Sequence, residues 1–246
     1  MRTDFQQFYV QPANVQNESF ILDGDEFRHA AKVLRKQQGD KISAVDGQGV
    51  LYHGKIRELE KDRLVADIFD TAPGVGEPAT KVIIALAALK GGHFDLVIEK
   101  GVEIGVSAFQ AMITDRVIAK RDTKTDRWRK KALTAMKQCG RSRCPDIFPP
   151  TDFKSVFINH KADRVFIAHE DVNPESGSHF DFDSKTSSVL VLIGPEGGFT
   201  DAEFEYAQQN GAIPLSLGPR RLRAETAAII AATKVLAAAG ELGAYI

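Results

Sequence analysis

Several features that mark other classes of protein are missing from these 246 residues. There are two cysteines, Cys139 and Cys144, too few for a disulfide framework, and no histidine stands near them to complete a metal site. The longest apolar run, Val82–Leu89, is far shorter than the ~20 residues of a membrane helix. The first ten residues lack the apolar stretch of a secretory signal. We therefore expect a cytoplasmic protein with no membrane partner and no metal.

An excess of charge of either sign is also missing, because the formal net charge is −1. The charge is unevenly distributed, however. The segment 116–143 holds 11 Lys and Arg residues against two Asp, a local charge of +9. A segregated basic segment is typical of a nucleic-acid contact, although a solvated helix face has the same pattern.

The most informative motif begins at Val189–Ile193, a continuous apolar run typical of a strand buried on both faces of a parallel sheet. The loop Gly194-Pro195-Glu196-Gly197-Gly198 follows, and its glycines let the backbone approach a ligand closely. Thr200 and Glu203 have the spacing of a capping box, so we predict a helix from here to about Gly211.

This loop lacks the phosphate-binding codes. It is not G-x-G-x-x-G, and no G-x-x-x-x-G-K-[ST] occurs in the chain. The carboxylate of Glu196 would repel a polyphosphate, which disfavours an NAD or ATP enzyme. A ligand with positive or neutral polar groups, such as S-adenosylmethionine, fits the loop. A purely structural strand–turn–helix connection is the alternative.

A second unit of the same kind follows. The short apolar strand Ile213–Leu217 leads into the loop 218–223, and the Ala-rich helix predicted over Ala224–Ala239 can end at Gly240. The loop holds three arginines in four residues, which a structural loop seldom needs and an anionic polymer does. Glu225, in the first turn of the helix, suits the helix dipole.

The rest of the chain divides in two. The first part reads as a small β-rich domain, with a helix over Glu26–Arg35 that ends at Gly39, strands over Lys41–Val45, Gly49–Ile56 and Leu64–Phe69, and a Pro/Gly-rich linker over Thr71–Thr80. The second part alternates strands (Lys81–Leu86, Ala108–Ile113, Arg164–Ala168) with helices (Phe94–Ile104, Thr125–Cys139, Asp152–Asn159) and contains an exposed loop over Asp171–Ser188. Such alternation predicts a parallel α/β sheet. His169 and Glu170 would then lie at the same edge as the two glycine loops.

The pair LIGPEGGFT and LSLGPRRLRAETA closely resembles the RsmE family of SPOUT-class methyltransferases, which methylate N3 of a uridine in 16S ribosomal RNA. The resemblance extends to EFRHAAKVLRKQQGD, FDLVIEKGVEIGV and RWRKKALTAMKQCGR, and so covers nearly the whole chain. The chain departs from the family at Arg221, where the family usually has an apolar residue, and at Gln6-Gln7, near which it usually has an arginine.

The resemblance implies an α/β fold: a SPOUT-type parallel sheet with a trefoil knot over residues 80–246, preceded by a small PUA-like, RNA-binding β-barrel over residues 1–72. It implies S-adenosylmethionine as cofactor, 16S ribosomal RNA or the small ribosomal subunit as partner, and a homodimer. The implied cofactor-binding residues lie in the two loops and beside them: Ala168, His169, Ile193, Gly194, Pro195, Glu196, Gly197, Gly198, Leu217, Gly218, Leu222 and Thr226.

Catalysis is assigned to arginines, which stay protonated and can stabilise the anion that forms when uridine N3 loses its proton. We expect Arg223 first and Arg220 second in this role. Solvent and Glu225 both remain open as the base that takes the proton. The expected RNA contacts are Arg28, Lys32, Arg35, Arg127, Arg129, Lys130, Arg141 and Arg221. Two other functions remain open at this point: a SPOUT enzyme that methylates a ribose 2′-OH or another base, and a non-catalytic RNA-binding protein.

Overall fold

The computed structural model describes residues 7–88, 92–117, 125–170, 172 and 186–243. The chain divides into two compact units. The first runs to Glu77 and also includes Leu133–Cys144, and the second consists of Pro78–Ala132 and the chain from Pro145 onward. The predicted domains, 1–72 and 80–246, are each continuous in the sequence. They therefore assign Leu133–Cys144 to the second domain, whereas the structure places this segment in the first unit.

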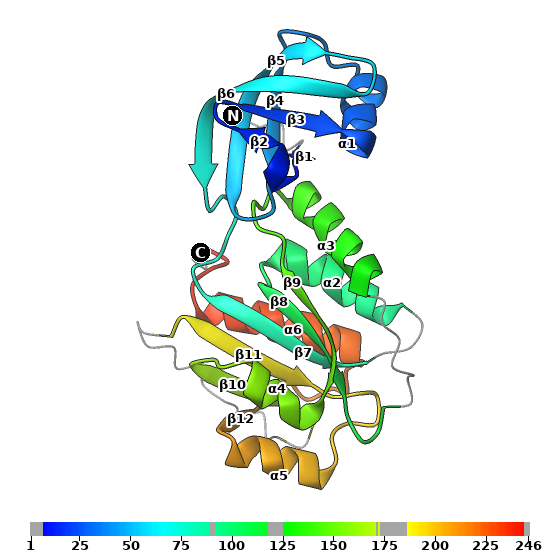
Figure 1. The fold of residues 1–246 in the computed structure, drawn as a ribbon. Coiled ribbons are helices and arrows are strands. Elements are labelled where there is room, and N and C mark those ends of the chain that lie inside the picture. The colour runs from blue at the N-terminus through cyan, green and yellow to red at the C-terminus, as the bar shows by residue number, and fades with distance from the viewer. Residues whose placement is uncertain (1–6, 89–91, 118–124, 171, 173–185, 244–246) are drawn as a thin grey trace. The chain divides into compact units, whose positions relative to one another are not determined.

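The first unit is built on a six-stranded sheet with the order β1-β4-β5-β6-β3-β2 (Figure 1). Neighbouring strands are antiparallel except β1 and β4, which are parallel. Alternate strand residues such as Phe20, Leu22 and Leu64 are fully buried in one core. The strands are β1 (Phe8–Tyr9), β2 (Val15–Gln16), β3 (Ser19–Asp23), β4 (Lys41–Val45), β5 (Val50–Leu59) and β6 (Arg63–Pro73).

Three details of this unit differ from the sequence prediction. The helix is α1 (Gly24–Arg28) followed by a π-helical turn over His29–Val33, and the chain leaves it at Arg35, which itself has a φ of 54°. Gly39 therefore does not end the helix. Strand β6 continues to Pro73, into the predicted linker. Strands β1 to β3 were not predicted, because two of them are only two residues long.

The second unit contains a six-stranded, entirely parallel sheet with the order β12-β10-β11-β7-β8-β9, which confirms the predicted parallel α/β fold. Its strands are β7 (Lys81–Ala87), β8 (Ala108–Ile113), β9 (Asp146–Asp152), β10 (Arg164–Ala168), β11 (Ser188–Ile193) and β12 (Ala212–Leu215). Strand β9 was missed because it contains Pro149 and Pro150, and proline is disfavoured within strands. It tolerates them because it is an edge strand.

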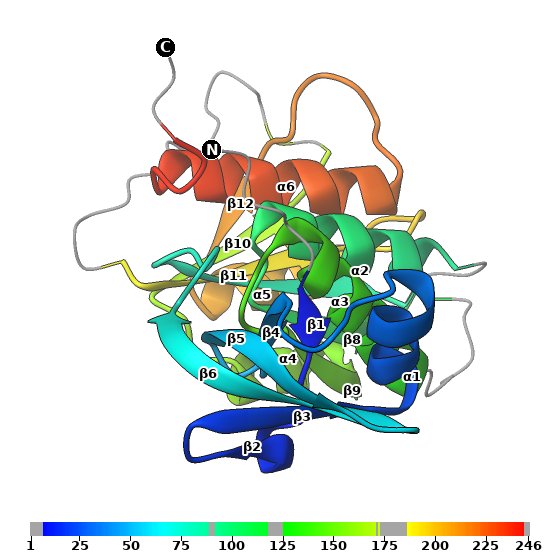
Figure 2. The ribbon, with the colours of Figure 1, turned by 90° about the horizontal axis from the view of Figure 1, so that it is seen from above.

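Helices cover both faces of this sheet, as Figure 2 shows. The helices α2 (His93–Ile104) and α6 (Ala224–Ala238) pack together on one face, where α6 contacts β7 and β11. On the other face, α4 (Phe153–Asn159) and α5 (Asp201–Gln209) bury aromatic side chains against Leu190 and Leu192 of β11. Strand β11 is buried on both faces of the sheet, which explains why its sequence is an unbroken apolar run.

The helix α3 (Thr125–Cys139) buries Trp128, whose ring stacks on Phe94 of α2 at 4.3 Å. No helix in the described residues is long and apolar enough to cross a membrane. Gln6 and nearly all of the loop predicted over 171–188 lie outside the described residues. The trefoil knot stays a prediction.

Candidate functional site

Three neighbouring strands of the parallel sheet end at one edge. Strands β10, β11 and β12 end at Ala168, Ile193 and Leu215, and β10 lies between the other two. The amide of His169 donates to the carbonyl of Leu215 at 3.2 Å, so the chain leaving β10 stays joined to β12. Loops at the carboxyl edge of a parallel sheet are where ligands bind in open α/β folds, and a cavity lies here.

The first glycine loop is a tight turn that only glycine allows. The amide of Gly198 donates to the carbonyl of Pro195 at 2.9 Å, and Gly198 has a φ of 70°. A Cβ atom at Gly194 would lie 3.2 Å from the ring of Phe199, a tighter contact than most real Cβ atoms make. Phe199 is buried in the core beside Phe153 and cannot easily withdraw. The two glycines therefore serve the shape of the loop.

The predicted capping box is confirmed at the start of α5. The Thr200 hydroxyl accepts from the Glu203 amide at 3.2 Å, and the Glu203 carboxylate accepts from the Thr200 amide at 2.8 Å. The other carboxylate oxygen of Glu203 accepts from the amide of Asp115 at 2.9 Å. One carboxylate thus joins the start of α5 to the segment that follows β8.

Arg116, in that same segment, holds the first loop. Its Nη1 donates to the carbonyls of Gly197 at 2.7 Å and Phe199 at 3.0 Å, and its side chain also lines the cavity. In the sequence, Arg116 stands out only as one cation of the basic segment. No local signal marked it, because its partners lie about 80 residues further along the chain.

The second loop is joined to the first by Arg221. Its Nε lies 3.3 Å from the Glu170 carboxylate, and its Nη2 donates to the Glu196 carbonyl at 3.4 Å. Gly218, with a φ of 113°, begins the turn, and Lys234 of α6 donates to the Ser216 carbonyl at 3.1 Å. Arg221, the residue that departs from the family pattern, therefore bridges the two loops.

The cavity is lined by all the predicted cofactor-binding residues except Thr226, which is exposed on α6. Three carboxylates, those of Glu170, Glu196 and Asp201, line it together with arginine side chains. This mixture of charges suits a ligand that carries both cationic and anionic groups better than a polyphosphate. The lining residues that the prediction of the cofactor site omitted are Arg116, Glu170, Phe199, Asp201, Arg220, Arg221, Ala224 and Ala227.

The two predicted catalytic arginines occupy different positions. Arg220 lines the cavity, whereas Arg223 is exposed outside its lining and stands at the N-cap of α6 without capping it. Glu225, in the first turn of α6, lies 3.4 Å from Nδ1 of His93, and its side chain is mostly buried. This contact gives Glu225 a structural partner besides the helix dipole.

In the folded chain, carboxylates from other elements neutralise part of the positive charge of the basic segment. Carboxylates from other elements pair with its cations: Arg127 with Asp95, Lys131 with Glu99 and Lys137 with Glu26. Arg129 pairs with Asp126 on its own helix. The local charge of +9 counted from the sequence is therefore larger than the net charge that the folded segment presents. Arg127, Arg129 and Lys130 are all exposed.

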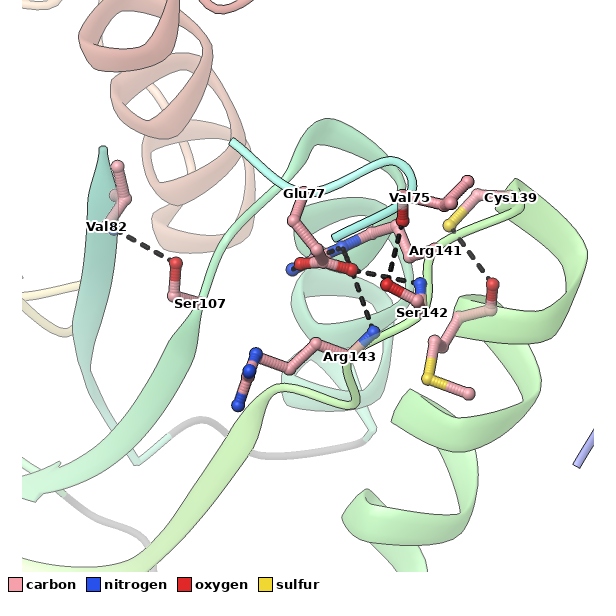
Figure 3. A network of polar contacts seen from close by, with 9 residues as sticks. Val75, Glu77, Val82, Ser107, Cys139, Arg141, Ser142 and Arg143 are labelled. Atoms are coloured by element: carbon pink, nitrogen blue, oxygen red, sulfur yellow. Dashed lines mark hydrogen bonds and ion pairs between the residues drawn. The ribbon is translucent and has the colours of Figure 1, made fainter. Parts of the chain in front are cut away.

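Arg141 corrects one predicted RNA contact. Its side chain is 4% exposed, and its guanidinium donates to both carboxylate oxygens of Glu77, which lies within the predicted linker. The same carboxylate accepts from the amides of Ser142 and Arg143 at 3.0 and 2.8 Å (Figure 3). A buried guanidinium in such a network cannot reach a phosphate, so Arg141 is a structural residue of the first unit.

The predicted contacts of the first unit, Arg28, Lys32 and Arg35, are all exposed. Arg28 pairs with Asp25 at 2.8 Å. Exposure leaves these side chains available to phosphates.

The comparison with known proteins agrees with this geometry. The RNA methyltransferase domain family matches residues 76–236, and the RNA methyltransferase PUA domain family matches residues 22–69. Ribosomal RNA small subunit methyltransferase E of Mesomycoplasma hyopneumoniae is 32% identical over 70% of this chain and 76% of its own length. This chain belongs to the ribosomal RNA small subunit methyltransferase E family.

Another member of the family aligns over almost its whole length. The Bacillus subtilis protein of the same name is 29% identical over 94% of this chain and 95% of its own. Among solved structures, a putative methyltransferase from Legionella pneumophila in complex with the cofactor SAM superposes with a TM-score of 0.82 and 30% identity, over 95% of this chain and 97% of its own. The SPOUT methyltransferase fold and the PUA-like domain are thereby confirmed, as is the family inferred from the two loops.

Proposed function

We propose that this protein uses S-adenosylmethionine to methylate N3 of a uridine in 16S ribosomal RNA. The observation that carries the proposal is the cavity at the carboxyl ends of β10, β11 and β12, closed by two glycine loops and free of any phosphate-binding code. The names of the relatives support the RNA class, and the SAM complex of the Legionella relative supports the cofactor.

The backbone of the two loops is expected to hold the cofactor. Gly194–Gly198 and Leu217–Leu222 border the cavity from two sides, and Ala168 and His169 border it from a third strand. When bound there, S-adenosylmethionine supplies a methyl group on a sulfonium sulfur. Loops that hold donor and acceptor in line would lower the barrier by several kcal/mol, up to ~7–11.

The acceptor must lose a proton before or during transfer. Solvent would take this proton from N3 of uridine, and the bound cofactor would supply the methyl group in its place and leave as the thioether. Negative charge on the uracil ring is greatest as the proton leaves, and a guanidinium beside the ring stabilises it. Arg220 is now the first candidate because it lines the cavity, and Arg223, which follows in the same loop, is the second.

The proposed function also implies a substrate, a location in the cell and an oligomeric state. The proposed substrate is 16S ribosomal RNA or the small subunit, and the proposed location is therefore the cytoplasm. Exposed cations of both units, including Arg28, Lys32, Arg35, Arg127, Arg129 and Lys130, are available to the RNA backbone. A homodimer, implied by the family, would complete the site across two subunits.

The direct test uses small ribosomal subunits from cells that lack this protein. The purified chain and S-adenosylmethionine are added, and the modified nucleotide is identified by mass spectrometry. The expected result is one new methyl group, on N3 of a single uridine. A methyl on a ribose 2′-OH or on another base would overturn the proposed position. Titration calorimetry that shows no heat with S-adenosylmethionine would overturn the proposed reaction and favour a protein that only binds RNA.

A further inference from the structure

An aromatic side chain is exposed at a β-bulge in the first unit. Between β5 and β6 the register pairs His53 with Asp70 and Gly54 with Ile68, so Phe69 has no opposite residue in the ladder. Phe69 is 59% exposed, whereas the neighbouring Ile68 packs against the domain core. Bulges re-aim side chains and are frequent beside functional sites.

The residue opposite the bulge can only be glycine. A Cβ atom at Gly54 would lie 2.8 Å from the ring of Phe20, 3.1 Å from the Asp67 carbonyl and 3.2 Å from Ala66 Cβ. Phe20 is fully buried, so its ring cannot move aside. The close approach of the strands therefore fixes both the bulge and the outward position of Phe69.

A second ring lies beside the first. The rings of His53 and Phe69 are nearly parallel, at an angle of 23°, with their centroids 6.4 Å apart. Nδ1 of His53 lies 3.0 Å from the Ser43 hydroxyl, which fixes the orientation of the imidazole. These two adjacent, nearly parallel rings form the aromatic surface of the sheet.

Cations surround this surface. Nζ of Lys41 lies 5.8 Å from the centre of the Phe69 ring, and Lys55 is the strand partner of Lys41. Both lysines, together with Arg57, line an open hollow of about 780 Å³ that Phe69 borders. One carboxylate, that of Asp67, lines it as well, and it pairs with Arg57 at 2.7 Å. Lys41 and Lys55 leave the hollow with an excess of positive charge.

We propose that this surface is a stacking site for an unpaired nucleobase of the RNA substrate. The base stacks on Phe69 beside His53, and the adjoining phosphates lie at Lys41 and Lys55. Aromatic rings bordered by cations suit single-stranded RNA because every base has a π-face and every nucleotide carries a phosphate. The inference rests on the proposed function in one respect, that the partner is RNA.

The first test compares three variants of the full chain for binding to a fluorescein-labelled oligouridylate and to unmodified small subunits. Phe69→Ala should weaken binding about 5- to 150-fold, the range of one base–aromatic stack. Phe69→Tyr, which keeps the ring, should stay within about twofold of the wild type. Leu59→Ala removes a similarly exposed apolar side chain from the same sheet and should also stay within about twofold.

A second test separates stacking from charge. In Phe69→Trp the new indole fluorescence should be quenched by the oligouridylate and not by an abasic oligonucleotide of the same length. The slope of log K against log salt should be unchanged in Phe69→Ala and should fall by about 0.7 in Lys41→Gln, the value for one phosphate contact on a single strand. Equal quenching by the abasic strand would overturn the stacking site.

Binding of S-adenosylmethionine distinguishes this proposal from the proposed function. It should be the same in all these variants, because Phe69 lies in the first unit and the cofactor cavity is lined by residues of the second. Normal RNA affinity in Phe69→Ala would overturn the stacking site and leave the methyltransferase proposal intact. Loss of cofactor binding in the wild type would overturn the methyltransferase proposal and leave the stacking result to stand on the RNA data.

Discussion

The arginines of the second glycine loop and those of the basic segment look alike in the sequence and differ in the folded chain. In the basic segment, Arg127 and Arg141 pair with carboxylates from distant parts of the chain. In the loop, Arg220 and Arg223 form no ion pair within the part of the chain that the structure describes, and Arg220 borders the cavity. Cations that the fold neutralises hold the protein together, and cations that it leaves open are available to a ligand.

The largest expected effect is on methyl transfer. Arg220→Ala should lower kcat at least about 100-fold, or ~3 kcal/mol, because it removes a group that stabilises charge formed only during the reaction. Binding of S-adenosylmethionine should change less than about threefold. Single-turnover methylation of small subunits and titration calorimetry give the two values.

Arg223→Ala is the matched comparison for Arg220→Ala, and Arg129→Ala is the control from the basic segment. If Arg223→Ala lowers kcat more than Arg220→Ala does, the order assigned from the cavity is wrong. Equal losses in all three variants would show that general electrostatics, and not a positioned guanidinium, controls the rate.

The second expected effect is on stability. Arg141→Ala should lower the free energy of unfolding by about 3 kcal/mol, because it leaves the largely buried Glu77 carboxylate without its cation. Urea unfolding measures the difference. Arg129→Ala, which breaks an exposed i,i+3 pair, should cost less than about 0.5 kcal/mol. A cost for Arg141→Ala as small as that control would contradict the structural role.

The third effect is smaller and concerns cofactor affinity. Arg116→Ala should weaken binding of S-adenosylmethionine about 5- to 20-fold, because two charge-assisted hydrogen bonds to the first loop are lost and the loop must be ordered on binding. Arg116→Lys should recover part of the loss. Calorimetry provides the affinity, and kcat at saturating cofactor should be close to the wild-type value. A fall in kcat with unchanged affinity would assign Arg116 to the acceptor instead.

The smallest expected effect is a shift in the pKa of Asp163. This carboxylate, like those that pair with the basic segment, is held by specific partners. The amide and hydroxyl of Ser187, followed by the hydroxyl of Ser188, lower the pKa of Asp163 to about 2. A depressed pKa means that these bonds stabilise the fold above pH ~4 and that their contribution is lost as the pH falls through about 2. NMR titration of the Asp163 carboxyl measures this, with Asp163→Asn as the assignment control. Titration near pH 4 would show that the serines do not hold it.

Much of the second unit could be predicted from its sequence because the signals there are local. A buried strand, a glycine turn and a capping box each occupy a few consecutive residues, and the bounds of β8, β10 and α3 agree with the prediction. The order of strands places the loops side by side, and the carboxyl-edge rule for parallel sheets anticipated it.

What could not be predicted depends on partners distant in the chain. The ion pair of Arg141 joins residues 64 positions apart, and the bonds of Arg116 span more than 80. Strand β9 carries two prolines that only its edge position permits. The exposure of Phe69 depends on a register shift against β5, which no pattern within β6 reveals.

The ion pair between Glu77 and Arg141 also limits how the first unit could be produced as a separate fragment. Cutting the gene after codon 77 would produce a fragment whose last carboxylate has lost its guanidinium, and which lacks the short stretch 133–144 that belongs to the same unit. A usable fragment would have to carry that stretch as a graft or as an added peptide.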